Sequence, residues 1–140
     1  MILRGLVGSG DLEQVIATVP FFTWMGLEID RARPSLTTHL PFRERHVGNE
    51  MIGALHGGIV AAFLEATATI ALVADGKLER VPKPINLTVD YLRSAKTESL
   101  YGEATIAKLG RRVASLRATC WQEDRNAPVA DAICHFLVGG

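Results

Sequence analysis

The sequence has little of what usually marks a nucleic-acid or membrane-surface protein. Its 15 basic and 15 acidic residues cancel, so the formal net charge is zero when histidine is neutral. Such a chain has no overall field to attract nucleic acid or an anionic membrane, and we expect neither partner. Aromatic residues make up only 6%, against 48% hydrophobic residues in all. Its 140 residues suffice for one well-filled core, and we expect a single domain over residues 1–140.

Cysteine is also scarce. Cys120 and Cys134 both lie in alternating apolar runs, which is typical of reduced packing thiols in a cytoplasmic protein. A disulfide between neighbouring strands is the alternative. The first ten residues have one basic residue, a very short apolar run and no small-residue cleavage site, so we predict no signal peptide.

Histidines offer no metal site. His39, His46 and His135 have no ligand spacing with a cysteine or a carboxylate pair. We therefore expect no metal ion.

One long apolar stretch stands out. Between residues 57 and 74 there is a single charged side chain, Glu65. As a helix this stretch would be about 27 Å long. Its apolar stripe at helical spacing consists of Ile59, Phe63, Ala66, Ile70 and Val73. The length approaches that of a membrane span, but the central glutamate and the internal glycines and threonines favour a helix buried in protein.

Glu65 is the first candidate functional residue. It points away from the apolar stripe, and Thr69 lies one turn further along beneath it. A buried carboxylate without a partner is costly, and burial should raise its pKa so that it becomes a better base near neutral pH. The alternative is a structural ion pair with Arg93 or with an arginine of a second subunit.

His56, Gly57 and Gly58 precede this helix. A helix start leaves backbone N–H groups unpaired and carries the positive end of the helix dipole, so it can bind an anion. The glycines would leave that surface open, although they could also serve only to permit close packing.

The remaining chain predicts one short helix and a sheet. Asp11 with Gln14 three residues later is a capping-box pattern for a helix over about 11–19 that stops near Pro20. Phe21, Phe22 and Trp24 should anchor that helix. A polar loop is expected over 44–53 and a connection over 77–84 that follows a helix-ending Asp75-Gly76 pair. Alternating patterns predict strands over 26–31, 35–42, 85–92, 100–109, 112–121 and 129–138.

The fold class that fits is α+β, with one antiparallel sheet curled around the long helix and the last four strands in meander order. The strand from residue 85 should place Ile85, Leu87, Val89 and Tyr91 on one face. Any part of the helix left bare would need a second subunit.

Two segments carry a resemblance to a known family. They are N-x-x-x-G-x-L-H-G-G-(x)6-E from Asn49 to Glu65 and INLTVDYLRSA over 85–95. Together they resemble the hotdog-fold acyl-CoA thioesterases, in particular the phenylacetyl-CoA and 4-hydroxybenzoyl-CoA branches. The similarity covers roughly residue 20 to the C-terminus.

The resemblance implies a mechanism. Gly57 would donate its backbone N–H to the thioester carbonyl, and Glu65 would act as nucleophile or general base. Thr69 would bond the glutamate, Asn49 would position water or thioester, and His56 would support the turn. The cofactor expectation is none, because coenzyme A is part of the substrate.

The resemblance also implies a homodimer or homotetramer with the site between subunits. The partner would contribute the strand near Pro84 and Ile85, where relatives often carry Ser or Thr at the position of Pro84. Gly58 would lie beside the substrate. Phosphates of coenzyme A could meet the basic residues Arg93, Lys108, Arg111 and Arg112, which could equally form a solvated turn.

Alternatives remain for several residues and for the reaction. Thr69 could bond the carbonyl four residues earlier, and Asn49 could make an Asx turn. The same fold also supports hydratases and dehydratases of acyl thioesters, which use histidine as proton carrier. A third possibility is a non-catalytic acyl-CoA-binding module.

Overall fold

The computed structural model describes residues 11–75 and 77–139. The first ten residues, on which the absence of a signal peptide was predicted, lie outside the described residues. So does Gly76, the second member of the predicted helix-ending pair.

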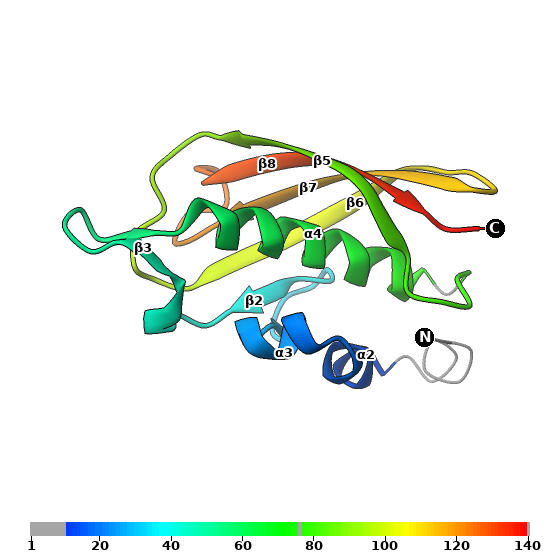
Figure 1. The fold of residues 1–140 in the computed structure, drawn as a ribbon, viewed down its shortest axis with the longest axis horizontal. Helices are drawn as coiled ribbons and strands as arrows, with labels where there is room; N and C mark the ends of the chain where they lie inside the picture. The colour runs from blue at the N-terminus through cyan, green and yellow to red at the C-terminus, as the bar shows by residue number, and fades with distance from the viewer. Residues whose placement is uncertain (1–10, 76, 140) are drawn as a thin grey trace.

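The long helix α4, Gly57–Ala74, has the predicted bounds and lies along the concave side of a sheet (Figure 1). All five residues of its predicted apolar stripe are buried. The helix is long and apolar enough to cross a membrane, with a mean hydropathy of 1.8, yet 61% of it is buried inside the protein. It is therefore the central helix of the fold.

The sheet has six strands in the order β1-β2-β6-β7-β8-β5, and every neighbouring pair is antiparallel. The strands are β1 Glu28–Ile29, β2 Thr38–Leu40, β5 Lys83–Tyr91, β6 Leu100–Leu109, β7 Val113–Trp121 and β8 Ala130–Leu137. Strands β7 and β8 alternate between buried and more exposed residues, so one face of the sheet covers the helix. This wrapped helix confirms the predicted hotdog architecture.

The prediction of a four-strand meander was wrong for β5. Strands β6, β7 and β8 do follow one another, but β5 pairs with β8 at the edge of the sheet and not with β6. Alternation along a segment predicts a strand but does not identify its neighbour. In the described chain the outer edge of β5 is consequently left without a partner strand.

The predicted face of β5 is also only partly right. Leu87 and Val89 are half-buried, whereas Ile85 and Tyr91 are exposed by 53% and 55%. The register shifts between Pro84 and Asn86, and this bulge accompanies the exposure of Ile85.

Two short helices occur near the N-terminus, where one was predicted. Helix α2, Leu12–Thr18, is capped by Asp11, whose side chain accepts a hydrogen bond from the Gln14 N–H. Pro20 begins a second helix, α3 (Pro20–Met25), since proline is favoured at a first helical position. The anchoring prediction holds for Phe22, which is buried, and fails for Phe21 and Trp24, which stack on each other at the surface.

The segment predicted as a loop over 44–53 has structure of its own. It contains the 3-10 turn η1 (Glu44–His46) and strand β3 (Val47–Asn49), which pairs with β4 (Ala54–Leu55) just before α4. A Cβ on Gly48 would lie 2.6 Å from the His56 Cα, so a glycine is needed there. This hairpin fixes where α4 begins.

The two cysteines are free and buried, as predicted. Cys120 pairs across the sheet with Ala130, while Cys134 pairs with Leu116, so the two thiols are offset along the neighbouring strands. Burial raises the pKa of the Cys120 thiol to about 12.

Candidate active site

The first turn of α4 is shaped by a histidine cap. His56 has extended backbone angles, and its Nδ1 accepts a hydrogen bond from the Gly58 N–H at 2.9 Å. Its own N–H donates to the carbonyl of His46 at 2.7 Å. Within residues 11–75 and 77–139, no acceptor takes the N–H of Gly57. The start of the helix therefore keeps one backbone donor available for a ligand.

The structural reasons for a glycine differ between positions 57 and 58. A Cβ on Gly58 would lie 2.9 Å from the His56 Nδ1, so Gly58 is required by the cap. A Cβ on Gly57 would meet its nearest atom, the Tyr91 hydroxyl oxygen, at 3.6 Å, which is an ordinary contact. Packing and backbone conformation thus account for Gly58 but leave the glycine at position 57 unexplained.

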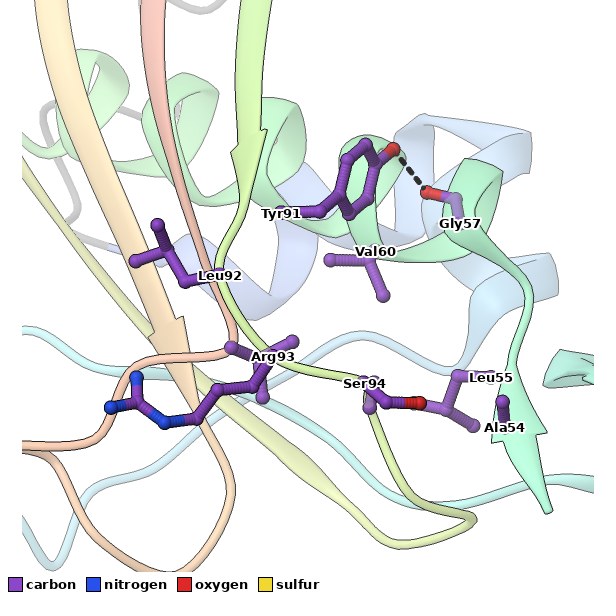
Figure 2. A pocket seen from close by; sticks show the side chains of 10 residues that line it. Ala54, Leu55, Gly57, Val60, Tyr91, Leu92, Arg93 and Ser94 are labelled. Atoms are coloured by element: carbon purple, nitrogen blue, oxygen red, sulfur yellow. Dashed lines mark hydrogen bonds between the residues drawn. The ribbon is translucent and has the colours of Figure 1, made fainter. Parts of the chain in front are cut away.

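Gly57 opens onto a surface cleft of about 340 Å³ (Figure 2). Tyr91 lies over the helix start at its rim and donates a hydrogen bond to the Gly57 carbonyl at 2.8 Å. The cleft has a mostly apolar lining with Arg93 and Ser94 at one side. Its residues are Ala54, Leu55, Gly57, Val60, Tyr91, Leu92, Arg93, Ser94, Ala95 and Val129.

Glu65 lies two turns further along α4 and is half-buried. Burial raises the pKa of its carboxyl group above the ordinary value of 4.5. No side chain in the described parts of the chain forms an ion pair or a hydrogen bond with this carboxylate. Its charge also contributes, after burial, to raising the pKa of the Cys134 thiol to about 11.

The position of Cys134 locates the carboxylate. Cys134 lies on β8 between Leu87 of β5 and Leu116 of β7. Glu65 is therefore near the β5–β8 side of the sheet, where the outer edge of β5 is open. A carboxylate with a raised pKa and no cation beside it can accept a proton from water or attack a carbonyl carbon.

Arg93 is not the ion-pair partner of Glu65 that one alternative predicted. Its guanidinium donates to the carbonyl of Pro128 at 2.7 Å and points away from Gly57, although Arg93 is one of the residues that line the cleft (Figure 2). Arg93 and Gly57 thus line the same cleft.

Thr69 and Asn49 make the local contacts that were left open as alternatives. The Thr69 hydroxyl donates to the main-chain carbonyl of Glu65 at 3.0 Å and not to its carboxylate. The Asn49 Oδ1 accepts from the N–H groups of Met51 and Ile52 at the tip of the β3–β4 hairpin, which is an Asx turn.

Four other predicted site residues lie at the opposite end of the molecule from Gly57. The register pairs Tyr91 with Ala130 and Lys83 with Leu137, and Leu137 pairs with Val113. The far end of β5 is about 26 Å from Tyr91 at the rise of a β-strand. The residues near that end are Pro84, Ile85, Arg111 and Arg112.

Sequence reasoning missed several residues of the cleft. Tyr91 and Ser94 belong to the segment that carried the resemblance, but their side chains were not assigned to the site. Tyr91 was treated as one of four alternating strand residues. Its place at the last position of β5, beside the start of α4, is tertiary information that alternation does not contain.

The fold and this site define a hotdog-fold thioester hydrolase. A family model described as "Thioesterase superfamily" matches residues 52–129, and the chain belongs to that family. The match begins in the β3–β4 hairpin and includes α4, β5, β6 and β7 in full.

Known relatives agree with this assignment. The chain is 28% identical to "Medium/long-chain acyl-CoA thioesterase YigI" of Salmonella typhimurium over 91% of this chain and 90% of the relative. A Chromobacterium violaceum protein of known structure is 31% identical with a TM-score of 0.70, covering 99% of this chain and 94% of its own. A hypothetical thioesterase from Streptococcus pneumoniae, solved with coenzyme A, shares the fold at 16% identity and a TM-score of 0.67 over 81% of this chain and 89% of its own.

Proposed function

We propose that this protein hydrolyses medium- or long-chain acyl-CoA to a free fatty acid and coenzyme A. The activity for which the YigI relatives are named supports the substrate class, since the alignment spans nearly the full length of both chains. The neighbour solved with coenzyme A supports a coenzyme A thioester as the form of the substrate. The largely apolar lining of the cleft at Gly57 suits an acyl group.

The observation that carries this proposal is the state of Glu65. A structural glutamate in a buried helix would be expected to have a cation or several hydrogen-bond donors beside it. Glu65 has neither among the described residues, and its pKa is raised by burial. A chain that keeps a costly carboxylate there is keeping a reactive group.

The reaction then follows from two groups. The Gly57 N–H stabilises the negative charge that develops on the thioester oxygen. As general base, Glu65 takes a proton from water while a C–O bond forms at the carbonyl carbon. The C–S bond then breaks, the electron pair leaves on sulfur, and the proton passes to the thiolate. As nucleophile, Glu65 would attack the carbonyl carbon and form a mixed anhydride as the C–S bond breaks and the thiolate leaves and takes up a proton. Water would then cleave the anhydride to the free acid and the Glu65 carboxylate.

These two groups cannot serve one thioester within a single chain. Gly57 and Glu65 are eight residues apart on α4, which corresponds to about 12 Å along the helix axis. A carbonyl group must lie about 3 Å from both an oxyanion donor and an attacking group. We therefore propose a homodimer in which the Gly57 of one subunit faces the Glu65 of the other.

The edge of the sheet supports such a dimer. Strand β5 has nine residues and an open outer edge, and an exposed edge of this length is a pairing surface. Ile85, Tyr91 and Leu92 add exposed apolar area beside it. Antiparallel pairing of two β5 strands about a two-fold axis would bring the start of one strand to the end of the other.

In this arrangement the predicted site residues that lie far from the cleft in one chain would be supplied to it by the partner subunit. Pro84 and Ile85 of the partner subunit would lie near Tyr91 and the cleft at Gly57. The partner's turn with Arg111 and Arg112 would be carried to the same side, where it and Arg93 could meet the phosphates of coenzyme A. Asn49 at the nearby hairpin remains a proposed contact to water or thioester.

The cap geometry argues against the hydratase and dehydratase alternative. A proton-carrying histidine needs a ring nitrogen directed at the substrate. The Nδ1 of His56 accepts the Gly58 N–H, and His56 is not among the residues that line the cleft. None of the other histidines in the described chain lines it either.

Thiol release from a series of short, medium, long and aromatic acyl-CoAs tests the proposal. The wild-type protein should release thiol, and Glu65→Ala should lower kcat by roughly 10²–10⁴-fold, the range for loss of a general base. Glu123→Ala, in the exposed β7–β8 turn, is the matched control and should behave as wild type.

Two outcomes would contradict the proposal. One is wild-type turnover in a folded Glu65→Ala protein. The other is loss of the enoyl-CoA absorbance without thiol release, which would indicate hydration of the double bond.

A further inference from the structure

Tyr91 joins the end of the sheet to the start of the central helix. Its hydroxyl donates to the Gly57 carbonyl at 2.8 Å, across 34 residues of sequence. That carbonyl also belongs to the first turn of α4, where it can accept the usual bond within the helix. The phenol therefore adds a bond that the helix itself does not require.

The peptide between Gly57 and Gly58 is held at both ends. Tyr91 bonds its carbonyl at 2.8 Å and His56 bonds its N–H at 2.9 Å. Two consecutive glycines give a backbone its greatest conformational freedom, and a first helical turn lacks part of its hydrogen bonding. These two side chains restrict that freedom on either side of the peptide plane.

The backbone around Tyr91 is held in place by hydrogen bonds to β8 and the segment before it. It pairs with Ala130 on β8 at the last position of β5. The next N–H, of Leu92, donates to the Val129 carbonyl at 2.8 Å, and the Arg93 side chain donates to Pro128 at 2.7 Å. The hydroxyl therefore transmits the position of the sheet to the turn that carries the Gly57 N–H.

We propose that Tyr91 is a positioning residue for thioester hydrolysis, which holds the Gly57 N–H in the direction that the developing oxyanion needs. This inference rests on the function proposed above. A donor that is already oriented stabilises transition-state charge without reorganisation, so loosening it should lower kcat more than it weakens substrate binding. Tyr91 acts through Gly57, and its hydroxyl takes no part in proton transfer.

The test is Tyr91→Phe, which removes the hydroxyl and keeps the ring at the rim of the cleft. We expect kcat to fall about 10-fold with KM within about twofold, because only the orientation of a transition-state contact is lost. The pH dependence of kcat should keep its shape. Tyr101→Phe is the matched control, since Tyr101 stacks on His39 and Trp121 and lies away from the cleft.

A second readout does not depend on activity. Amide hydrogen exchange at Gly58 and Ile59, whose N–H groups donate to the Nδ1 and the carbonyl of His56, should be about 2- to 10-fold faster in Tyr91→Phe than in wild type when followed by NMR. Tyr101→Phe should leave both amides unchanged.

Unchanged kcat together with unchanged amide exchange in Tyr91→Phe would overturn the inference. So would a fall in kcat accompanied by an equal rise in KM, or a shifted pH profile, which would give the phenol a direct role with substrate or proton. If wild type releases no thiol from any acyl-CoA, the proposed function fails by itself. Faster exchange in Tyr91→Phe would then still support the positioning of the turn.

Discussion

At the scale of single residues, the partly buried environment of Glu65 lowers the stability of the fold when the carboxyl group is ionised and makes the carboxylate a stronger base. Burial raises the pKa of its carboxyl group, so the folded protein holds the proton more tightly than the unfolded chain. The same desolvation makes the carboxylate a stronger base once the proton has left. The fold is therefore less stable than it would be with a neutral group at position 65 whenever that carboxyl is ionised.

The first prediction concerns Glu65→Gln. The unfolded carboxyl titrates near its ordinary value of 4.5 and the folded one above it, so stability is full below 4.5 and falls as pH rises through the raised pKa. At neutral pH the variant should gain roughly 2–5 °C in Tm, as about 1 kcal/mol does in a domain of this size. At a pH below 4.5 the two proteins should have similar Tm. Thermal unfolding at a series of pH values measures both.

In activity the same variant should lose kcat by roughly 10²–10⁴-fold, the range for a general base. In the wild type, kcat/KM should decline as pH falls through the raised pKa of the free protein. A Glu65→Gln protein that is less stable than wild type at neutral pH would show that the carboxylate has a stabilising partner.

The second prediction distinguishes the effect of losing the Gly57 N–H from the effect of adding a side chain at position 57. His56 has φ −64° and ψ 129°, angles that a residue before proline adopts, and position 57 is the first of the helix. Gly57→Pro should therefore fold while lacking the N–H, and Gly57→Ala should fold and keep it. We expect kcat of the proline variant to be roughly 10²–10³-fold below that of the alanine variant.

Circular dichroism and Tm provide the check on folding for this pair. Equal kcat in the two folded variants would mean that the Gly57 N–H does not bind the oxyanion.

At the scale of elements, the close approach of α4 and β6 decides where the helix sits. A Cβ on Gly102 of β6 would lie 2.9 Å from Phe63, Thr67 and Thr38. The hydroxyls of Thr38 and Thr67 are 2.6 Å apart and buried. A glycine in the strand thus lets the helix and β2 meet over β6 with their polar groups paired.

The third prediction follows from this contact. Gly102→Ala should lower the free energy of unfolding by roughly 1–3 kcal/mol, the cost of overpacking a filled core. Gly57→Ala serves as the control, because its added methyl group has an ordinary contact and should cost nothing measurable. Urea unfolding of both variants gives the comparison. Equal stability of Gly102→Ala and wild type would mean that the helix can shift on the sheet.

Local sequence patterns predicted most elements, and the exceptions have physical reasons. The long, mainly apolar run predicted the bounds of α4, and alternation located β6 and, to within a residue or two, β7 and β8. The β3–β4 hairpin was missed because its strands have two or three residues, too few to show alternation. The edge position of β5 was missed because neighbours in a sheet are set by the whole topology.

In the candidate site, too, the residues of a single element could be predicted from the sequence, whereas those brought together by the tertiary structure could not. His56, Gly57 and Glu65 share one helix, so their spacing could be read directly from the chain. Tyr91 could not be placed, because it reaches Gly57 only through the crossing of β5 over α4. Pro84 and Arg111 lie far from the cleft of their own chain, which no local pattern reveals.

At the scale of the whole molecule, the separation of Gly57 and Glu65 would make the proposed dimer necessary for the proposed reaction. In the proposed mechanism each chain offers an oxyanion donor at one end of α4 and a base near its middle, about 12 Å apart along the axis. A dimer paired along the open edge of β5 would contain two equivalent sites, each built from both chains. Activity should then depend on protein concentration when the dimer dissociates.

The fourth prediction uses this shared site. Glu65→Ala and Gly57→Pro should each be nearly inactive alone. After the two are unfolded together and refolded as a mixture, half of the dimers should be mixed, and each mixed dimer has one site with both native groups. Thiol release should therefore recover to about a quarter of the wild-type rate per chain.

The recovery separates two architectures that a single inactive variant cannot. If Gly57 and Glu65 of the same chain formed each site, every chain in the mixture would carry a defective site and no activity would return. Refolding each variant by itself is the control, and sedimentation of the mixture gives the fraction of dimers. Recovery near a quarter, which disappears when the dimers are diluted to monomers, would place the Gly57 N–H of one subunit opposite the Glu65 carboxylate of the other.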